Sequence, residues 1–584
     1  MSKENIKKNI IFENSMLFAC ASYFSIPFTR TINNIPDFDF TKLKEALNLT
    51  LGAIQKAPLV IPNITELKTI GLIGLGIVFF TFYRFSNIKN YMKDKAYGSS
   101  RWAKKREIKE LKGKKNIILG ENVYLDINTR KTDINDNIAV LGSSGSRKTR
   151  GYVKPNLMES AKNGIFDGII VTDPKGELLI ETADMMKKSG YDIKVFDIKN
   201  WSGNCWNPFK YFKTDEDVLS FVKSLIQNTN GDNTNGDKFW ENSSILLFNS
   251  VFFYLIEKCP LEDRSLVNVK KLINLCSVKE EDEEHISTLD IMFNNLEKEN
   301  PNSKAVSFYK SFKMASGKTL KSIIISCLAN LNFIGLEKVD RMLGETDEFD
   351  LENVGYNKTI IYICIPDDDV SFNFLSSMFI DQMFRTLIRK ADTVRNKPYI
   401  HFYLDEFANL GKFPSFSEKL STIRSRNISL TIILQSIQQL KANYKGKDEI
   451  ILENCNTKVC LGTSESAKWV SEKLGKQTID NKTHGKSYGR NKGSSTNDSQ
   501  MARNLLDPNE VEQLDNSKEI IMIKGKYPIL CNKYDITKHS YYKKLGDVND
   551  ESNKNNYYLE EPVKRNISSL DKLIKEQLEI ENKN

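Results

Sequence analysis

Residues 142–149 have the sequence GSSGSRKT and directly follow the apolar run IAVL at 138–141. This segment has the frame of a P-loop, G-x-x-x-x-G-K-[S/T], in which a buried strand leads through a small-residue loop into a helix. The frame constrains the fold because strand, loop and helix N-terminus direct several backbone N–H groups at one point, which suits a phosphate. One position departs from the frame, since Arg147 stands where the second glycine is expected.

Every residue of this loop is a candidate nucleotide contact. Lys148 is expected to reach the outer phosphates, and the Thr149 hydroxyl is expected to hold Mg²⁺. We therefore predict ATP and Mg²⁺ as cofactors. The predicted nucleotide-binding residues are Gly142, Ser143, Ser144, Gly145, Ser146, Arg147, Lys148 and Thr149.

Beyond about residue 115, short apolar runs alternate with helical patterns. This alternation predicts an α/β fold with a parallel sheet covered by helices. Near-continuous runs of Ile, Val, Leu and Tyr are typical of strands that are buried on both faces. The predicted strands are 138–141, 168–172, 359–365, 399–404, 428–434 and 458–461.

A second motif follows the predicted strand 399–404, where Asp405 and Glu406 come directly after the apolar run. Chemistry in parallel sheets gathers at the carboxyl ends of the strands. A buried strand that ends in two carboxylates has the form of a Walker B site. We predict that Asp405 holds the metal together with Thr149 and that Glu406 polarises the attacking water. The alternative, a turn that carries acidic residues by chance, is weaker because a P-loop lies upstream.

Two further catalytic candidates flank the predicted strand 428–434. Gln435 follows the strand, in a position to sense the γ-phosphate or to place the water. Arg424 precedes the strand and is a candidate to stabilise transition-state charge in a neighbouring subunit's site. Arg426 is equally near, and either arginine can instead cap a helix or bind DNA.

A second GKT sequence at 317–319 is rejected as a nucleotide site. Phe312 stands where the first glycine of the frame would be, and residues 308–315 have helical spacing rather than the pattern of a strand.

Two apolar segments near the start of the chain predict a membrane anchor. Residues 10–29 contain a single charge, and residues 69–83 contain none. Crossing a bilayer core takes about 20 apolar residues, and Lys68 and Arg84 can extend the shorter segment by snorkelling. We predict transmembrane helices at about 10–29 and 69–85, with an extracytoplasmic loop between them. A cleaved signal peptide is the alternative for the first segment.

Composition restricts the function less than these motifs do. The net charge of +9, from 84 basic and 75 acidic residues, permits an anionic partner without requiring one. The nine cysteines form no C-x-x-C pair, which argues against a zinc site and a disulfide scaffold.

Together these motifs resemble the type IV coupling proteins, the TraG/TraD group of membrane-anchored, RecA-like ATPases of conjugation and type IV secretion. The resemblance covers roughly residues 70–540. The segments that carry it besides the P-loop frame are YGSSRWA at 97–103, KTR at 148–150 with PNL at 155–157, DPKGE at 173–177, WNP at 206–208, DEFANLG at 405–411, QSIQQL at 435–440, RNLL at 503–506 and KGKYP at 524–528.

The resemblance implies a RecA-like P-loop NTPase with an all-helical domain inserted into the nucleotide-binding domain. It also implies a ring, commonly of six subunits, with ATP bound between neighbours. By motif, Arg424 matches the arginine finger of the family and Gln435 matches its sensor. The predicted domains are a membrane anchor over 1–96, a nucleotide-binding domain over 97–213 and 344–546, an all-helical insertion over 214–343, and a charged tail, expected to be flexible, over 547–584.

The function that the resemblance implies is that of a multi-pass cell-membrane ATPase with most of its chain in the cytoplasm. It would recruit a relaxase-bound single DNA strand to a type IV secretion channel and help drive its transfer. The implied partners are single-stranded DNA with its relaxase, the channel proteins, the membrane and further copies of the chain in a homo-hexamer. Two alternatives stay open: an ATPase that recruits protein effectors, and a non-hydrolysing membrane receptor whose conformation is set by nucleotide.

A translocase must bind the DNA backbone irrespective of sequence, so basic side chains near the sensor strand are candidate contacts. The candidates are Lys441, Lys445 and Lys447 after that strand, and Lys486, Arg490 and Lys492 in a polar loop.

Overall fold

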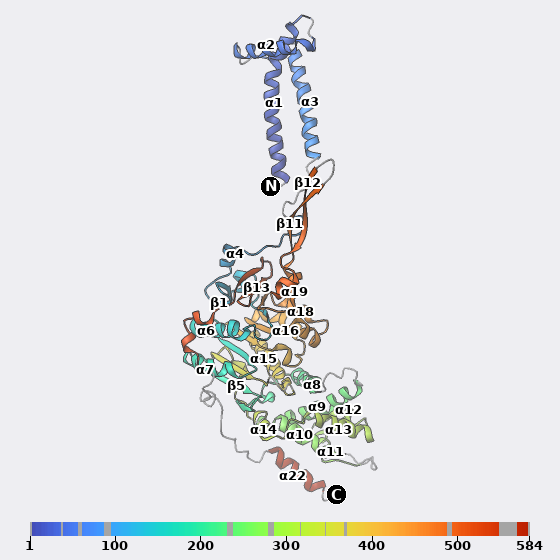
Figure 1. Cartoon of the computed structure of the whole chain (residues 1–584). Helices are drawn as coiled ribbons and strands as arrows, with labels where there is room; N and C mark the ends of the chain where they lie inside the picture. Colours follow the sequence, from blue (N-terminus) through green and yellow to red (C-terminus); the bar gives the residue numbers. More distant parts are fainter. Residues whose placement is uncertain are drawn as a thin grey trace. The chain divides into compact units, whose positions relative to one another are not determined.

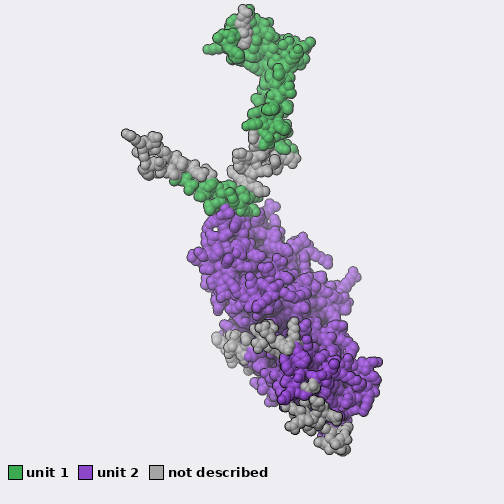
Figure 2. All heavy atoms as spheres, turned by 90° about the vertical axis from the view of Figure 1, so that its right-hand side faces the viewer, with its two compact units in different colours: residues 1–99, 478–501 green, residues 100–477, 502–584 purple. Residues whose placement is uncertain are grey.

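The computed structural model describes residues 3–36, 39–56, 61–86, 95–229, 238–277, 285–315, 317–344, 346–366, 371–487, 493–547 and 569–581. The chain divides into two compact units, which are coloured separately in Figure 2. The first comprises residues 1–99 with 478–501, and the second comprises residues 100–477 with 502–584.

The first unit contains a pair of long helices. Helices α1 (Lys3–Asn34) and α3 (Ile64–Ser86) lie side by side, joined through α2 (Leu43–Lys56) (Figure 1). Polar contacts link the pair toward both ends, since Arg30 Nε lies 2.5 Å from Glu66 Oε1 and Asn14 Nδ2 donates to Thr81 Oγ1 at 2.7 Å. A two-stranded antiparallel sheet of β11 (Lys476–Ser487) and β12 (Gly493–Asn504) lies largely in this unit.

Among the described helices, α3 alone is long and apolar enough to cross a membrane. It contains the predicted span at 69–85. The predicted span at 10–29 lies within α1, and α1 is not apolar enough to count as a candidate membrane helix by the same measure. A second transmembrane helix at 10–29 therefore stays a prediction.

The second unit is built on a ten-stranded sheet in the order β14-β13-β10-β3-β9-β8-β4-β7-β5-β6. The strands from β10 to β5 in this order run parallel, whereas β13, β14 and β6 pair antiparallel at the two edges. The predicted parallel sheet is thereby confirmed. The strands are β3 (Ile138–Leu141), β4 (Gly168–Asp173), β5 (Asp192–Asp197), β6 (Ser202–Gly203), β7 (Thr359–Cys364), β8 (Ile400–Leu404), β9 (Ile428–Leu434), β10 (Thr457–Cys460), β13 (Lys518–Ile523) and β14 (Ile529–Asn532).

Each central strand is buried on both faces. Ala139 and Leu141 of β3 belong to the core that also contains α15 (Phe374–Thr393). Ile138 and Val140 of the same strand belong to a second core, formed with α6 (Lys154–Asn163) and α7 (Glu177–Lys188). Because side chains alternate between the faces of a strand, a strand with a core on each side needs apolar residues at every position.

Between β6 and β7 the chain forms a group of helices (Figure 1). They are α8 (Asp215–Thr229), α9 (Lys238–Lys258), α10 (Leu266–Asn274), α11 (Thr288–Glu299), α12 (Lys304–Phe312), α13 (Gly317–Asn330) and α14 (Glu337–Met342). The remaining elements of the second unit are α4 (Lys105–Lys109), β1 (Asn116–Gly120), β2 (Val123–Asp126), α5 (Thr129–Thr132), α16 (Phe416–Ile423), α17 (Ile437–Asn443), α18 (Asp448–Asn454), α19 (Ala467–Leu474), α20 (Pro508–Glu512) and α22 (Ser569–Glu581).

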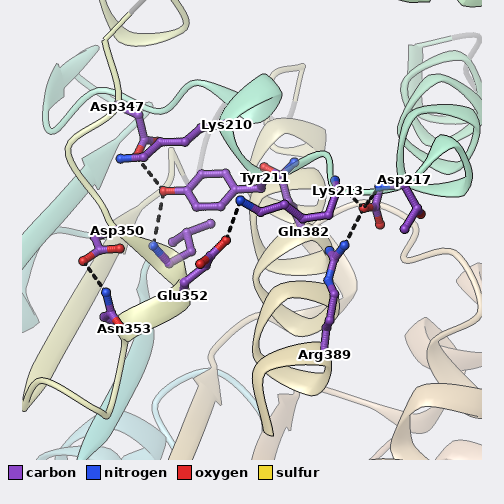
Figure 3. Close-up of polar contacts among 12 residues, drawn as sticks. Lys210, Tyr211, Lys213, Asp217, Asp347, Asp350, Glu352, Asn353, Gln382 and Arg389 are labelled. Atoms are coloured by element: carbon purple, nitrogen blue, oxygen red, sulfur yellow. Dashed lines mark hydrogen bonds and ion pairs between the residues drawn. The ribbon is translucent and has the colours of Figure 1, made fainter. Parts of the chain in front are cut away.

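The chain segments that enter and leave this helical group are tied together at Asp347 (Figure 3). The Tyr211 hydroxyl donates to Asp347 Oδ2 at 2.6 Å and accepts the Leu351 N–H at 3.2 Å. Lys210 Nζ also contacts Asp347 Oδ2, at 3.1 Å. Burial and the Asp347 carboxylate raise the pKa of Tyr211, so its hydroxyl stays protonated and donates.

Helix α15 joins the same junction through Arg389, whose Nη1 lies 2.7 Å from Asp217 Oδ2 at the start of α8 (Figure 3). The helical group is therefore fixed to a helix that itself packs on the sheet.

The end of the tail forms a helix that packs on the helical group. Helix α22 contacts α11, and its Leu570 side chain is fully buried. The Leu570 N–H donates to Asp263 Oδ2 at 3.2 Å, and Lys271 Nζ lies 3.0 Å from Asp571 Oδ1. Residues 548–568 of the segment that we expected to be flexible lie outside the described residues.

The Tyr211→Phe substitution tests the junction. It removes the hydrogen bond to Asp347 and leaves the buried Leu351 N–H without its acceptor. We expect the free energy of unfolding to fall by about 1–3 kcal/mol, seen as a lower midpoint of thermal unfolding by tryptophan fluorescence. Tyr542→Phe, at an exposed tyrosine, is the control, and equal midpoints for the two variants would contradict the role of the junction.

Candidate active site

The loop after β3 is held by the ends of both neighbouring strands. The Gly142 N–H donates to the Leu434 carbonyl and the Ser143 N–H donates to the Gly462 carbonyl, each at 3.0 Å. A Cβ atom on residue 142 would lie 2.3 Å from Ser146 Oγ. A side chain at the first position of the loop would therefore have to displace the Ser146 hydroxyl.

The backbone conformation at residue 147 explains why the P-loop frame has its second glycine at this position. Gly145 and Arg147 have φ values of +76° and +69°, in the left-handed region that favours glycine. Arg147 adopts the conformation that a glycine would adopt there, with a strain of about 1–2 kcal/mol. Helical backbone begins directly afterwards, first as the turn Thr149–Val153 and then as α6, so Lys148 and Thr149 stand at a helix N-terminus.

Two side chains of the loop are arranged to meet an anionic ligand. Lys148 Nζ donates to the Gly142 carbonyl at 2.8 Å, and burial lowers the pKa of Lys148 while the charges of Asp405 and Glu406 act in the opposite direction. Ser146 Oγ is buried and has no hydrogen-bond partner in the part of the chain that the structure describes. A ligand oxygen at the loop would give the Ser146 hydroxyl its missing partner.

The carboxylate of Asp405 lies beside the loop. It follows β8, and its Oδ2 accepts the Thr149 hydroxyl at 3.2 Å. Burial raises the pKa of Asp405, whereas the charge of Lys148 and the hydrogen bonds from the Glu406 N–H and Thr149 lower it. A hydroxyl and a carboxylate held this close are oxygen donors of the kind that Mg²⁺ binds.

Glu406 is oriented by two amide side chains. Gln435 Nε2 donates to its Oε1 at 3.2 Å, and Asn409 Nδ2 donates to its Oε2 at 2.9 Å. The backbone of Glu406 is left-handed, with a φ of +51°. The structure thus brings together Glu406 and Gln435, which were predicted as site residues from two separate motifs. It also adds Asn409, which sequence reasoning did not single out as a site residue.

Arg424 lies at the other end of β9 from Gln435. Its side chain is exposed, and Nη2 donates to the Thr129 carbonyl at 3.2 Å. Arg426 is instead engaged with Asp392, with Nη2 and Oδ2 2.7 Å apart. The structure does not bring Arg424 to the P-loop of its own chain.

Lys533 and Asp173 also belong to the site, and motif spacing did not indicate either role. Lys533 is buried, and its Nζ donates to the Ser146 carbonyl at 3.0 Å. Asp173 ends β4 and accepts the N–H groups of Gly176 and Leu179, each at 2.9 Å. Burial raises the pKa of Asp173 to about 6, against these hydrogen bonds.

The segment after Glu406 is tied to the helical group. Asn228 of α8 accepts the Lys412 N–H at 3.0 Å and donates to the Lys412 carbonyl at 3.1 Å. The neighbouring Gly411 has a φ of +94°, and a Cβ there would lie 3.1 Å from Asn228 Oδ1. The close approach of α8 to this loop therefore depends on glycine.

A protein-family model described as "Type IV secretory system Conjugative DNA transfer" matches residues 90–566. The chain belongs to this family. The match spans more than half of the chain and confirms the resemblance that the motifs indicated.

Curated members of the type IV secretion and conjugal transfer group are distant relatives. VirD4 of Rhizobium rhizogenes is 25% identical over 191 residues, which cover 32% of this chain and 28% of VirD4. The probable conjugal transfer protein TraG of Sinorhizobium fredii is 21% identical over 412 residues, which cover 68% of this chain and 61% of TraG. The chain therefore spans less than two thirds of the length of these relatives.

Solved structures of a coupling protein share the fold. The bacterial conjugative coupling protein TrwBdeltaN70 in its unbound form matches with a TM-score of 0.57 and 16% identity, over 77% of this chain and 96% of its own. The plasmid coupling protein TrwB in complex with ADP and Mg²⁺ matches with a TM-score of 0.55 and 16% identity, over 76% and 96%. These likenesses and the sheet topology establish an α/β NTPase fold.

The Arg147→Gly substitution tests the strain in the loop. It removes about 1–2 kcal/mol of left-handed strain but adds about 0.5–1 kcal/mol of chain entropy to the unfolded state. We expect the free energy of unfolding without nucleotide to rise by about 0.5–1 kcal/mol, seen as a higher thermal midpoint. Arg106→Gly, on the exposed helix α4, is the matched control and should lower the midpoint. A lower midpoint for Arg147→Gly would show that the arginine stabilises the loop.

The raised pKa of Asp173 predicts a pH dependence of stability. Between the pKa of about 3.9 in the unfolded chain and the pKa of about 6 in the folded chain, only the folded state holds the proton. The free energy of unfolding therefore falls as pH rises through this window, by on the order of 2 kcal/mol, and levels off above it. Thermal midpoints without nucleotide should show this fall in the wild type.

Asp173→Asn should remove this part of the fall, and it should lower the midpoint below about pH 4, where the wild-type carboxyl is neutral in both states, because one N–H loses its acceptor. Asp192→Asn, at an exposed aspartate, should keep the fall. An unchanged fall in Asp173→Asn would assign the dependence to other groups.

Proposed function

We propose that this chain is a membrane-anchored coupling ATPase that recruits a relaxase-bound single DNA strand to a type IV secretion channel and helps drive its transfer. One observation carries the ATPase part of the proposal. The loop residues Lys148 and Thr149 and the carboxylates of Asp405 and Glu406 converge at one edge of the sheet. Membership of a conjugative DNA transfer family supports the cargo.

In this proposal the loop from Gly142 to Thr149 holds the phosphates of ATP. Lys148 turns from the Gly142 carbonyl to the outer phosphates, and Thr149 and Asp405 supply the oxygen atoms that hold Mg²⁺. When bound, Mg²⁺ supplies positive charge against the phosphate oxygens. The structures of TrwB in complex with ADP and Mg²⁺ and with a non-hydrolysable ATP analogue support these ligands.

In this proposal Glu406 activates the attacking water. Its carboxylate orients the attacking water and accepts its proton, while Gln435 and Asn409 keep both oxygens in position. A carboxylate that is held from both sides does not have to reorganise during the reaction.

Arg424 acts in trans within a homo-hexameric ring in this proposal. Its exposed guanidinium donates to the neutral Thr129 carbonyl and acts on the buried Asp136 carboxyl. It forms no ion pair with any residue that the structure describes, so its charge remains available to the site of a neighbouring subunit. Arg426 is less suited to that role because its guanidinium is paired with Asp392.

The anchor is proposed to cross the cell membrane twice, through α1 and α3, with most of the chain in the cytoplasm. The ion pair of Glu13 with Arg84, at 2.9 Å, and the pair of Arg30 with Glu66 link the two helices toward opposite ends and support an antiparallel pair that inserts together. Charged groups that are paired at helix ends are compatible with a membrane-spanning hairpin.

Contacts with single-stranded DNA and with channel proteins are further proposals. Lys441 and Lys445 remain candidates, whereas Lys447 is paired with Glu418 at 2.7 Å. Arg490 and Lys492 lie outside the described residues, and the side chain of Lys486 is not described. A family of DNA transfer proteins favours DNA over a cargo of protein effectors alone.

The Glu406→Gln substitution tests the proposal, because glutamine keeps the shape of the side chain but cannot accept the proton. We expect steady-state ATP hydrolysis to fall by about 10²–10⁴-fold, with ATP binding retained and DNA transfer lost in a mating assay. Glu449→Gln, at an exposed glutamate on α18, should retain activity.

Full turnover in Glu406→Gln would contradict the catalytic assignment. A wild-type chain that binds ATP but hydrolyses none, with or without single-stranded DNA, would favour the non-hydrolysing receptor. Export of protein effectors without DNA transfer would favour the protein-cargo alternative.

A further inference from the structure

A buried aspartate lies close to Arg424, at the edge of the sheet where β3 and β9 begin. Asp136 and Arg424 line the same small cavity, together with Tyr399 and Asn427. The volume of this cavity is about 10 Å³, which is room for about one water molecule. A space of this size excludes a small-molecule ligand, so the side chains that line it act on one another.

The backbone of Asp136 is fixed by both of its neighbours in sequence. The side chain of the preceding Asn135 accepts the Asn456 N–H at 3.1 Å. The side chain of the following Asn137 accepts the Leu430 N–H, also at 3.1 Å. These contacts tie the segment before β3 to the start of β10 on one side and to β9 on the other. The sheet itself therefore determines the position of Asp136.

The carboxyl of Asp136 is buried without a full set of partners. Asp136 is 6% exposed, and its Oδ1 has no hydrogen-bond partner in the part of the chain that the structure describes. A buried polar atom without a partner costs about 1–3 kcal/mol, so it calls for an explanation. Burial and the charge of Asp126 both raise the pKa of Asp136, whereas the charge of Arg424 acts against them. The guanidinium of Arg424 is therefore placed to favour the carboxylate form.

The two charged groups that act on Asp136 differ in how far they are engaged. Asp126 is paired with Lys131, whose Nζ lies 3.3 Å from Asp126 Oδ2. Arg424 forms no ion pair with any described residue, and its Nη2 donates to the Thr129 carbonyl at 3.2 Å. A guanidinium has five N–H donors, and this contact uses one of them. Arg424 therefore keeps donors for the Asp136 carboxyl and for a ligand.

An exposed arginine that acts on a neighbouring subunit has to be held in place. The side chain of Arg424 projects from a short turn, Arg424–Arg426, and is exposed. An arginine side chain carries about 2 kcal/mol of rotamer entropy, and a misplacement of about 1 Å in an active site can cost about 10²-fold in rate. A partner on a rigid element reduces this cost, because it fixes the guanidinium before the reaction.

We propose that Asp136 is a positioning residue for Arg424: when the ring forms, its carboxylate binds the guanidinium and directs it to the nucleotide of the neighbouring subunit. This inference rests on the proposed function, in which Arg424 acts in trans. Asp136 itself touches neither nucleotide nor water and acts only through the arginine. The unpartnered Oδ1 of Asp136 and the single neutral contact of Arg424 are then two halves of one interaction, which the subunit completes in the ring.

Steady-state ATP hydrolysis by the detergent-solubilised full chain tests this role. We expect Asp136→Asn, which keeps the size of the side chain, to lower kcat by about 10–100-fold. The KM for ATP should stay unchanged, because Asp136 does not contact the nucleotide. Arg424→Ala should lower kcat by about 10³-fold or more. Adding Asp136→Asn to that variant should slow it no further, since Asp136 acts through the arginine. Asp133→Asn, at an exposed aspartate three residues earlier, should retain full turnover.

Rings of mixed subunits separate this role from a merely structural one. Co-expressed Asp136→Asn and Glu406→Gln subunits should hydrolyse ATP faster than the two variants do separately. The reason is that a Glu406→Gln subunit supplies an intact Asp136 and Arg424 to the site of a neighbour whose Glu406 is intact. A defect that Asp136→Asn causes in its own nucleotide site would gain nothing from mixing. Arg424→Ala mixed with Glu406→Gln is the positive control and should show the same gain.

The outcomes distinguish a failure of this inference from a failure of the proposed function. No hydrolysis by the wild type, full turnover in Arg424→Ala, or no gain when Arg424→Ala is mixed with Glu406→Gln would overturn the role of Arg424 and, with it, that of Asp136. If Arg424 behaves as expected, three results would overturn the role of Asp136 alone: full turnover in Asp136→Asn, a further loss in the double variant, or no gain when Asp136→Asn is mixed with Glu406→Gln.

Discussion

Parallel pairing of β3, β9 and β8 decides where the P-loop, Asp405, Glu406 and Gln435 of the candidate active site lie. In the register of these strands Leu141 lies beside Leu434, and Leu404 lies beside Ile432. The residues that follow the strands, from Gly142, Gln435 and Asp405 onward, are consequently brought to one edge of the sheet. The hydrogen bond from the Gly142 N–H to the Leu434 carbonyl extends this ladder into the loop. A shift of one residue in either pairing would turn the side chains after the strands to the other face.

The sheet in turn depends on burial of both its faces. β3, β8 and β9 are buried at every position, and each fully buried aliphatic side chain contributes about 1.5–3 kcal/mol. The packing of these apolar side chains fixes the backbone next to the strands, including residues whose conformation is unfavourable by itself. Arg147 and Glu406 both adopt left-handed backbone conformations, which persist only where the surrounding structure determines them. At Glu406 that structure includes Gln435 and Asn409, which fix both carboxylate oxygens.

Much of this arrangement could be predicted from local sequence. The run 399–404 differs from β8 by one residue, and 428–434 coincides with β9. The second GKT sequence lies at the start of helix α13, after helix α12, as its helical spacing predicted. These features depend on which residues fill a buried strand or a helix, and sequence patterns report that directly.

Other features depend on contacts between distant segments. Lys533 reaches the Ser146 carbonyl across 387 residues of sequence, so no spacing rule links the two. The sequence showed that Arg147 stands where the P-loop frame has glycine. Only the backbone of the structure shows that this position has a positive φ, which explains why glycine is usual there. The burial of Leu570 against the helical group was also hidden, because the charged residues around it indicate solvent exposure.

The contacts around Glu406 also connect the candidate active site to the helical group within a few residues. Asn409 binds the Glu406 carboxylate, and three residues later the backbone of Lys412 is held by Asn228 of α8. Because this segment is short and hydrogen-bonded at both ends, Glu406 cannot move far without displacing α8 or breaking the pair at Lys412. The second attachment of α8, through Asp217 and Arg389, leads back to α15 beneath the sheet. Helix α8 is thus held at one end by α15, which packs on the sheet, and elsewhere by the loop that follows Glu406.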